Sequence, residues 1–378
     1  MKCIHCQTDS TYPERQANGG RCKKCQHPFA FEPKTKPLGG GPLSDGLFQR
    51  LLDDVSSKGK SAFTDRQLWF ELNRRIRQRQ VKATRAGGIG CAAIGGGFGV
   101  FAAVALSSPI PLLLSGLGLA LGAAIYLSAG GKKGESQPPL VGWAEFAPLL
   151  ARWREVHGDP PRLADPRLPA LLPGNQEPDL TGYSFDRALV TERSDLAAML
   201  VASNFHFENN CAILSLDGYP EGRAGTVLEM LRRNPELRVF AVHDASIPGC
   251  SLVHRLRDPA WFPDHRVRII DLGLRPKHAQ ELRLSALKAP PAHAAARDAH
   301  SAWREGLASE EIGWLAAGNM SELAELRPAR LMRAIYQGFA RANQLPDGSS
   351  AGAEADSGPG MIWFYHPGAD IHAADSFG

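Results

Sequence analysis

Residues 86–131 contain no charged side chain, and this stretch constrains the fold more than any other feature of the sequence. A bilayer core about 30 Å thick is crossed by a helix of about 20 apolar residues, so the stretch is long enough for two passes. The run Ser-Ser-Pro-Ile-Pro at 107–111 predicts a turn near its middle, because proline lacks an amide hydrogen. We expect helices over 88–107 and 110–128 that form a transmembrane hairpin. A buried helix pair in a soluble fold is the alternative, although such helices rarely avoid charge for so long.

Basic residues flank the charge-free stretch on both sides and predict its orientation. Positively charged segments stay on the cytoplasmic side of a membrane, so we expect a multi-pass protein of a bacterial inner membrane with both termini in the cytoplasm. Small residues at spacings of three or four in both helices allow close approach between them. The basic residues are Arg74, Arg75, Arg77, Arg79, Lys82 and Arg85 before the stretch, and Lys132 and Lys133 after it.

Two Cys-x2-Cys pairs stand at the N-terminus, in the pattern C-x2-C-x15-C-x2-C. Cys3 and Cys6 form the first pair, and Cys22 and Cys25 form the second. Four thiolates at this spacing complete a tetrahedral structural zinc site, and the scattered remaining cysteines favour a reducing compartment. We therefore expect one zinc ion. The sequence leaves open whether zinc only folds this segment or also presents a contact for nucleic acid or protein.

Composition divides the chain into segments of different character. A net charge of +4 is too mild to argue for nucleic acid by itself. Proline- and glycine-rich stretches predict linkers, and the final tail can dock on its own domain or on a partner protein as an extended peptide. The expected order is a zinc ribbon at 1–32, a linker at 33–46, a basic juxtamembrane helical segment at 47–85, the hairpin at 86–131, a connector at 132–184, an α/β domain at 185–280, a helical extension at 281–343, a disordered linker at 344–360 and an apolar and acidic tail at 361–378.

Short apolar runs alternate with helical segments from about residue 185 and predict an α/β domain with a parallel sheet. Ligands of such sheets gather beyond the carboxyl ends of the strands. Acidic residues follow the strands there, namely Glu192, Asp217, Asp244 and Asp271. Converging carboxylates suit Mg²⁺, because this ion binds a few carboxylates and completes its coordination shell with water and phosphate oxygens. The alternative for each acid taken alone is that it caps a helix or lies in a solvated loop. The expected strands are 188–191, 211–216, 237–242 and 267–272, and the expected helices are 195–202, 222–233 and 250–256.

Four short motifs occur in this region in the same order as in a known protein family. They are Val190-Thr-Glu192, Gly218-Tyr-Pro220, His243-Asp-Ala-Ser-Ile-Pro-Gly249 and Ile270-Asp-Leu-Gly-Leu-Arg-Pro276. Together they resemble the Toprim domain, in the version found in the A subunit of topoisomerase VI and its meiotic double-strand-break relative. The resemblance covers about 185–280. It implies that Glu192 and Asp244 are catalytic carboxylates that bind Mg²⁺, and that Gly218, Pro220, Ser246 and Gly249 help to form the cofactor site.

Two residues depart from the family pattern. Ser246 stands where the family has the second carboxylate of an Asp-x-Asp motif, so Mg²⁺ should bind more weakly. The segment 64–70 resembles the family's Arg-x-x-Tyr-Tyr sequence, but Phe70 stands in place of the tyrosine and has no hydroxyl. The chain is therefore not a tyrosine-dependent topoisomerase.

These observations favour a membrane-anchored cytoplasmic protein with a zinc ribbon and a Toprim-like domain. That domain would bind nucleic acid or a phosphate ligand with weak or lost catalysis. One alternative is a Mg²⁺-dependent nuclease in which Asp217 or Asp271 completes the site. The other is a membrane scaffold whose zinc ribbon and tail bind proteins and whose α/β domain is a pseudoenzyme.

Overall fold

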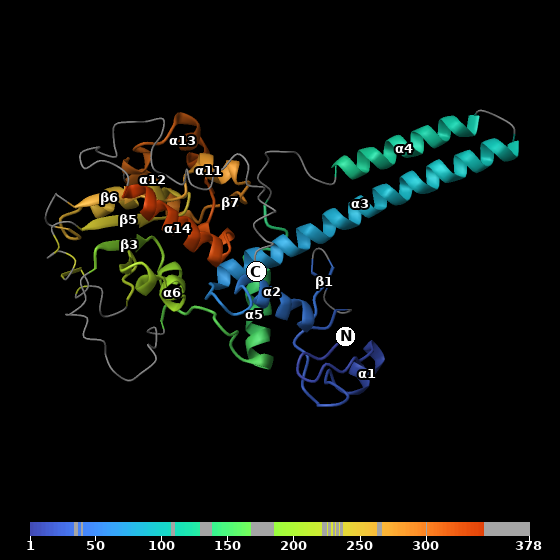
Figure 1. Ribbon diagram of the computed structural model, residues 1–378, viewed down its shortest axis with the longest axis horizontal. Helices are drawn as coiled ribbons and strands as arrows, with labels where there is room; N and C mark the ends of the chain where they lie inside the picture. Colours follow the sequence, from blue (N-terminus) through green and yellow to red (C-terminus); the bar gives the residue numbers. More distant parts are fainter. Residues whose placement is uncertain are drawn as a thin grey trace. The chain divides into compact units, whose positions relative to one another are not determined.

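The computed structural model describes residues 1–33, 37–38, 41–106, 110–128, 138–167, 185–220, 237–262, 267–299 and 301–343, together with Gly225, Leu228, Glu229, Leu231 and Asn234. The chain forms two compact units (Figure 1). The first contains Met1–Asp45, Leu72–Glu135 and Leu140–Phe146, and the second contains Gly46–Glu71, Ser136–Pro139 and Ala147–Gly378. The predicted turn at 107–109, the linker at 344–360 and the tail at 361–378 lie outside the described residues, as does most of the helix predicted over 222–233.

The described elements follow one another in two groups along the chain. The first group is α1 (Tyr12–Ala17), β1 (Pro37–Leu38), β2 (Gly41–Pro42), α2 (Asp45–Val55), α3 (Asp65–Leu106), α4 (Ile110–Ser128) and α5 (Trp143–His157). The second group is β3 (Arg187–Thr191), α6 (Ser194–Ala202), α7 (Phe205–Glu208), β4 (Cys211–Ser215), β5 (Arg238–Val242), α9 (Ile247–Cys250), α10 (Leu252–Leu256), β6 (Arg268–Asp271), α11 (Pro276–Glu281), β7 (Leu287–Lys288), α12 (Pro291–Ala299), η2 (Ala302–Arg304), α13 (Ser309–Ala316), β8 (Asn319–Met320), η3 (Leu323–Glu325) and α14 (Pro328–Ala342).

The N-terminal module contains two short loops with the same hydrogen bonds. In each loop the amide of the first cysteine donates to a carbonyl further along, and its own carbonyl accepts from a glutamine amide. Gln7 and Gln26 have φ angles of 58° and 57°, so both loops turn through the left-handed region. The donor–acceptor pairs are Cys3 N–Thr8 O (3.0 Å), Gln7 N–Cys3 O (2.9 Å), Cys22 N–His27 O (2.9 Å) and Gln26 N–Cys22 O (3.0 Å).

A buried ion pair and a shared carboxylate hold the rest of this module in place. Arg15 of α1 is 5% exposed and donates from Nε and Nη2 to the two carboxylate oxygens of Glu32, each at 2.8 Å. Asp45 accepts hydrogen bonds from the amides of Ala30 (3.0 Å) and Phe31 (2.9 Å). These polar contacts add to a small hydrophobic cluster around Phe29, because a segment of this size cannot build a large core alone.

Helices α3 and α4 occupy the positions predicted for the two arms of the hairpin, and they lie side by side (Figure 1). Glycines allow the approach. A Cβ atom on Gly88 would lie 2.8 Å from the carbonyl oxygen of Gly122, and one on Gly122 would lie 2.6 Å from Cβ of Ala92. Larger side chains face outward, as Ile94 and Leu127 are 74% and 76% exposed.

The prediction that this hairpin spans a membrane is wrong. Within the described residues, none of the helices combines the length and apolar character that a membrane crossing requires. Helix α3 continues without a break from the basic segment at its start, so the charge-free residues 86–106 belong to a helix whose first half carries Arg and Lys. Those residues are mostly Gly and Ala, which bury little apolar surface. The expected location in a bacterial inner membrane, with both termini in the cytoplasm, is overturned with it.

The second unit contains the predicted parallel sheet, which is confirmed. Its four strands lie in the order β4-β3-β5-β6, and every neighbouring pair is parallel. Thr191 at the end of β3 is opposite Ser215 of β4 and Val242 of β5. The carboxyl ends of three strands therefore lie level with one another, and the residues that follow β3 and β5 come together at one edge.

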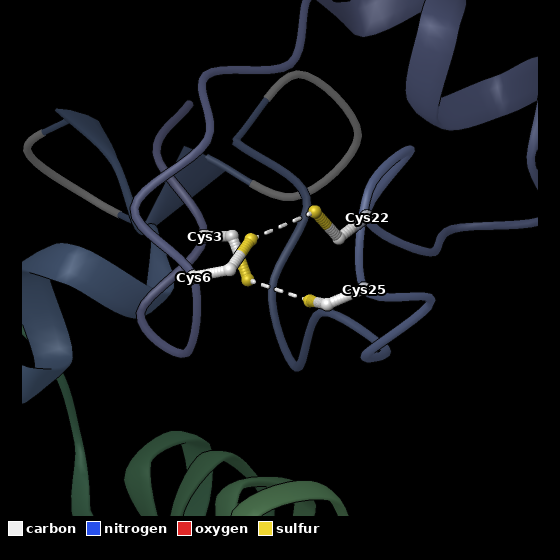
Figure 2. A group of neighbouring side chains, drawn as sticks. All are labelled: Cys3, Cys6, Cys22 and Cys25. Atoms are coloured by element: carbon white, nitrogen blue, oxygen red, sulfur yellow. Dashed lines mark hydrogen bonds between the residues drawn. The ribbon is translucent and has the colours of Figure 1, made fainter.

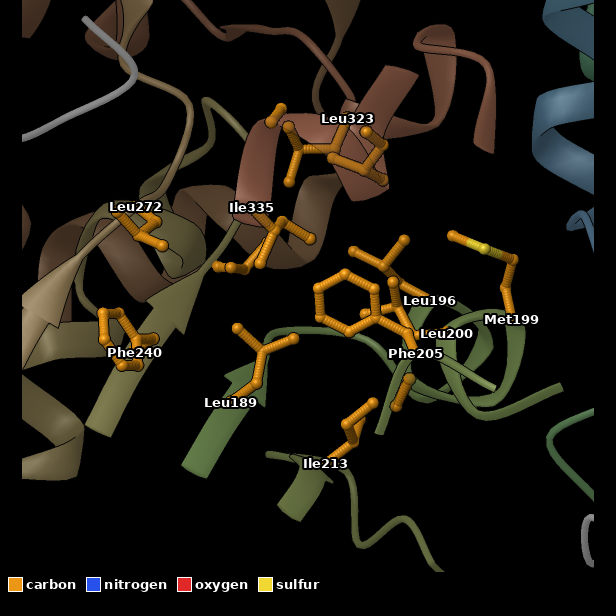
Figure 3. Packing of buried hydrophobic residues seen from close by; sticks show 14 of the residues in the cluster. Leu189, Leu196, Met199, Leu200, Phe205, Ile213, Phe240, Leu272, Leu323 and Ile335 are labelled. Atoms are coloured by element: carbon orange, nitrogen blue, oxygen red, sulfur yellow. The ribbon is translucent and has the colours of Figure 1, made fainter. Parts of the chain in front are cut away.

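Both faces of the sheet are buried, which explains the continuous apolar character of its strands. Successive side chains of a strand point to opposite faces. Leu189 packs in a cluster with Leu196 of α6 and Ile335 of α14 (Figure 3), whereas its neighbour Val190 packs with Leu256 of α10 on the other face. Burial of each such side chain stabilises the fold by about 1.5–3 kcal/mol.

The segment after the sheet returns to the end of β5. Strands β7 and β8 pair antiparallel, and beyond them Ala245 and Ser321 exchange two backbone hydrogen bonds of 3.0 Å. This bridge brings Glu322 and Leu323 beside Asp244, although they lie far away along the chain.

Candidate metal and carboxylate sites

The four N-terminal cysteines gather in one group, as predicted (Figure 2). The sulfurs of Cys3 and Cys25 are 3.7 Å apart, those of Cys6 and Cys22 are 3.5 Å apart, and all four lie within 4.8 Å of one another. A tetrahedron with Zn–S bonds of about 2.3 Å has edges of about 3.8 Å. The group is therefore consistent with a zinc site. Elsewhere in the described residues, no three His, Cys, Asp or Glu ligand atoms are gathered as tightly.

The chemistry of this group is that of a closed structural site. The hydroxyl of Thr8, 3.3 Å from the sulfur of Cys6, lowers the pKa of that thiol to about 6. A hydrogen bond to the backbone of His27 lowers the pKa of Cys25, but burial and the neighbouring sulfurs outweigh it and raise that pKa to about 12. A bound cation would favour the thiolate form at all four positions. The rings of His5 and His27 stack on each other at 5.3 Å and do not enter the sulfur group. Four thiolates leave no open position for water or substrate, so the site can fold the module but cannot activate a nucleophile.

A second site lies at the carboxyl edge of the parallel sheet. The structure brings together Glu192 after β3 and Asp244 after β5: the amide of Asp244 donates to Oε2 of Glu192 at 3.2 Å. The hydroxyl of Ser246 donates to Oε1 of Glu192 at 3.2 Å. A Cβ atom on Gly249 would lie 2.7 Å from Oε2 of Glu192, so only glycine fits against this carboxylate. These four predicted residues therefore share one site.

Ser246 also begins helix α9. Its hydroxyl accepts a hydrogen bond from the amide of Gly249 at 3.0 Å, which is the N-cap contact that serine commonly makes. One hydroxyl thus caps the helix and orients Glu192.

Two arginines enter the carboxylate site. Arg193 donates from Nε to Asp195 (3.0 Å) and from Nη1 to Glu322 (3.2 Å), and the same Nη1 lies 3.6 Å from Oδ2 of Asp244. Arg66, near the start of α3, donates from Nε to Glu322 at 2.9 Å. Burial lowers the pKa of Arg193, but the surrounding carboxylates raise it further than burial lowers it, so its guanidinium stays charged.

Negative charge remains in excess at this site. Four carboxylates, those of Glu192, Asp195, Asp244 and Glu322, meet the two guanidinium groups. Burial and then repulsion from Glu192 raise the pKa of Asp244 to about 8, although Arg193 opposes the shift. Among the described residues Glu192 has no cationic partner. A divalent cation would compensate this charge and reverse the shift.

His243 forms a separate pair behind the site. Its Nδ1 donates to the carbonyl of Asp244 at 2.8 Å, and its Nε2 lies 3.1 Å from Oδ1 of Asp271. Burial lowers the pKa of His243, but Asp271 outweighs that effect and raises it to about 9, while the pKa of Asp271 is lowered. A Cβ atom on Gly273 would lie 2.0 Å from the imidazole, so the ring packs directly on the backbone. Asp271 is thus engaged by His243 and not by Glu192.

The predicted turn after β4 is also at this edge. Asp217 is exposed and accepts a hydrogen bond from the amide of Ser194 at 3.2 Å. Gly218 has a φ of 92° and Pro220 follows in the same turn. The described contacts tie this turn to α6 and β4, and a cofactor role for Gly218 and Pro220 stays a prediction.

Sequence reasoning missed several members of the site. Arg66 and Glu322 are 256 residues apart, and no local pattern connects them. His293 of α12 was missed as well: burial lowers its pKa while Glu192 and Glu322 oppose the shift, and its Nδ1 has no hydrogen-bond partner in the described structure. The alternating charges of Glu192, Arg193 and Asp195 were the one local feature of the sequence that could have indicated a charged cluster here.

Comparison with protein-family models and with curated proteins gave no match. The fold and the sites therefore define a general class of protein and not a family. It is a protein with a four-cysteine cluster and an α/β domain with a parallel sheet, and the Toprim resemblance stays a prediction.

Proposed function

We propose that the α/β domain is a Toprim-like domain that binds one divalent cation at Glu192 and Asp244 and, through it, a phosphate group of nucleic acid. One observation carries the proposal: Glu192, after β3, accepts a hydrogen bond from the amide of Asp244, after the adjacent parallel strand β5, and its charge raises the pKa of the buried Asp244 carboxyl in a cluster with excess negative charge. Mg²⁺ binds through a few carboxylates and keeps positions for water and phosphate oxygens. The order of the four Toprim-like motifs supports the same assignment.

Catalysis at this site is weak or lost in the proposed function. Ser246 supplies a hydroxyl instead of a second carboxylate, and hydroxyls are poorer ligands for Mg²⁺. Nη1 of Arg193 lies 3.6 Å from Oδ2 of Asp244 and competes with a metal ion for this oxygen. Phe70 is 3% exposed and has no hydroxyl that can attack a phosphodiester. Binding of a phosphate ligand is therefore favoured over cleavage.

The four-cysteine module binds zinc and provides a second contact in this proposal. Its sulfur geometry fits a tetrahedral metal, and zinc coordination supplies the folding energy that a small module lacks. The second loop carries exposed Arg21 and Lys24 beside the cysteines. Basic side chains there suit a phosphate backbone or an acidic protein surface.

Metal titration of the full chain tests the proposal. Calorimetry should detect weak Mg²⁺ or Mn²⁺ binding to the wild type, and Glu192→Gln should abolish it. Glu208→Gln removes an exposed carboxylate on α7 and serves as the matched control, which should bind like the wild type. Anisotropy of a labelled oligonucleotide should rise more steeply with protein when Mg²⁺ is present.

Two results would change the conclusion. Equal Mg²⁺ binding by the wild type and Glu192→Gln would remove the metal site. Robust Mg²⁺-dependent cleavage of the oligonucleotide, lost in Glu192→Gln, would make the chain a nuclease instead of a binding protein.

A further inference from the structure

Three arginines form a row at the amino edge of the parallel sheet, opposite to the carboxylate site. Each is the first residue of its strand, and Arg187 of β3 is in register with Arg238 of β5, which is in register with Arg268 of β6. Register partners of parallel strands point to the same face of a sheet, so the three side chains leave one side. Adjacent strands lie about 4.8 Å apart, and this arginine row therefore spans about 10 Å.

The arginine row lies on the face of the sheet that α14 covers. Phe240, two residues after Arg238, packs on Phe339 of α14 with 4.5 Å between the ring centroids. The guanidinium of Arg187 lies over the same Phe339 ring at 5.3 Å. Arg238 donates from Nη1 to Oδ1 of Asn343, directly after α14, and this contact is open to solvent. Neutral partners thus hold these two guanidinium groups at the surface.

The positive charge of the row lacks a balancing carboxylate in the part of the chain that the structure describes. Arg187 and Arg238 form no ion pair there, whereas Arg268 has other contacts and adds a third charge. Asp186, next to Arg187, instead accepts a hydrogen bond from Nδ2 of Asn210 at 3.0 Å. The carboxyl end of α14 contributes only about half a negative charge. Like charges on neighbouring strands repel each other, so an anion bound here would stabilise the fold.

The spacing of the row favours one kind of anion. Guanidinium groups bind phosphate oxygens through paired, charged hydrogen bonds. A nucleic-acid strand carries a phosphate about every 3.4 Å along its axis, so about three phosphates lie along the row. An extended peptide presents side chains to one side only about every 6.8 Å, and an acidic peptide would therefore offer fewer charges over the same length.

We infer that the arginine row binds the phosphate backbone of a nucleic acid. It is distinct from the carboxylate site, because Arg238 begins β5 and Asp244 follows its end, and a strand of this length extends over about 16 Å. The inference rests on the proposed function only in that both sites take a nucleic acid as ligand. Binding at the row needs no divalent ion, and contacts to phosphates carry no information on base sequence.

Binding of labelled single-stranded oligonucleotides without added divalent metal tests the row. Anisotropy is measured with the full chain at several salt concentrations, for two oligonucleotides of different sequence. Arg238→Gln should weaken binding of both by about fivefold or more, since it removes a charged hydrogen-bond donor. It should also reduce the slope of log affinity against log salt by about 0.7, the contribution of one phosphate of a single strand.

Three comparisons separate the row from bulk charge and from folding. Arg255→Gln removes an exposed arginine of α10, which packs on the opposite face of the sheet, and should bind like the wild type. Arg238→Lys keeps the charge and should keep the salt slope. In the absence of nucleic acid, Arg238→Gln should melt at or above the temperature of the wild type, because it removes a repulsive charge. A purely structural arginine would lower that temperature.

The outcomes distinguish the row from the metal site. Glu192→Gln should leave metal-free binding unchanged. Unchanged affinity and salt slope in both Arg187→Gln and Arg238→Gln would overturn the inference, even if Mg²⁺ binding at Glu192 were found. An equal loss of affinity in Arg255→Gln would also overturn it, because bulk charge would then explain the binding. Displacement of the oligonucleotide by polyglutamate of equal total charge at equal concentration would assign the row to an acidic protein partner instead.

Discussion

Replacement of Ser246 by Asp adds a carboxylate to the site while keeping its backbone contacts. The serine hydroxyl lies 3.2 Å from Oε1 of Glu192 and accepts from the amide of Gly249 at 3.0 Å. Aspartate caps helices about as well as serine does, so α9 keeps its N-cap. The main change is one negative charge beside Glu192 and close to Asp244, in a site that already carries an excess.

The distance to Glu192 gives the size of the effect. Two like charges about 4 Å apart interact by about 4 kcal/mol at an effective dielectric constant of about 20. A unit of this size loses about 2–4 °C in melting temperature for each kcal/mol. Without metal, Ser246→Asp should therefore melt about 8–16 °C below the wild type. With Mg²⁺ the same repulsion becomes attraction to the ion, and the ligand stabilises the folded state by mass action.

Thermal melting of the full chain with and without Mg²⁺ measures both effects. Ser246→Asn is the matched control, because asparagine has the shape of aspartate and caps the helix without the charge. We expect Mg²⁺ to raise the melting temperature of Ser246→Asp far more than that of the wild type or Ser246→Asn. If the Asp and Asn variants melt together without metal, or if Mg²⁺ does not restore Ser246→Asp, the carboxylates do not form a cation site.

Two further predictions concern protons and zinc. The folded pKa of Asp244 is raised to about 8 from 3.8, so its contribution to stability is complete below about pH 4 and is lost as the pH rises towards 8. Asp244→Asn should flatten metal-free denaturant stability over this range, and an unchanged pH profile would contradict the raised pKa. Elemental analysis should find one zinc per chain and little in Cys22→Ser, because three thiolates hold the ion poorly; full zinc retention by the variant would remove this cysteine from the site.

Local sequence patterns were sufficient for the parts of the fold that local interactions form. The spacing of Cys3, Cys6, Cys22 and Cys25 predicted the sulfur group because each loop is closed by contacts within a few residues. The strands were predictable because both faces of the sheet are buried, which requires unbroken apolar runs. The meeting of Glu192 and Asp244 then followed from parallel strand ends.

Other features depend on contacts that no local pattern reveals. Glu322 reaches Asp244 only because Ser321 pairs with Ala245, and Arg66 reaches Glu322 across 256 residues of chain. The membrane prediction failed for a different reason. Lack of charge in residues 86–131 was taken as strong hydrophobicity, whereas many of these residues are glycine and alanine.

The two loops of the four-cysteine module are equivalent halves that their sulfurs connect. The hydrogen bonds of the first loop recur nineteen residues later, from Cys3 and Gln7 to Cys22 and Gln26, and each loop is closed by its own backbone. Sulfur pairs 3.5 and 3.7 Å apart, in contrast, join one loop to the other. A metal ion held by all four sulfurs would therefore cross-link the two halves, and loss of one cysteine would weaken the connection between the loops more than the hydrogen bonds inside either loop.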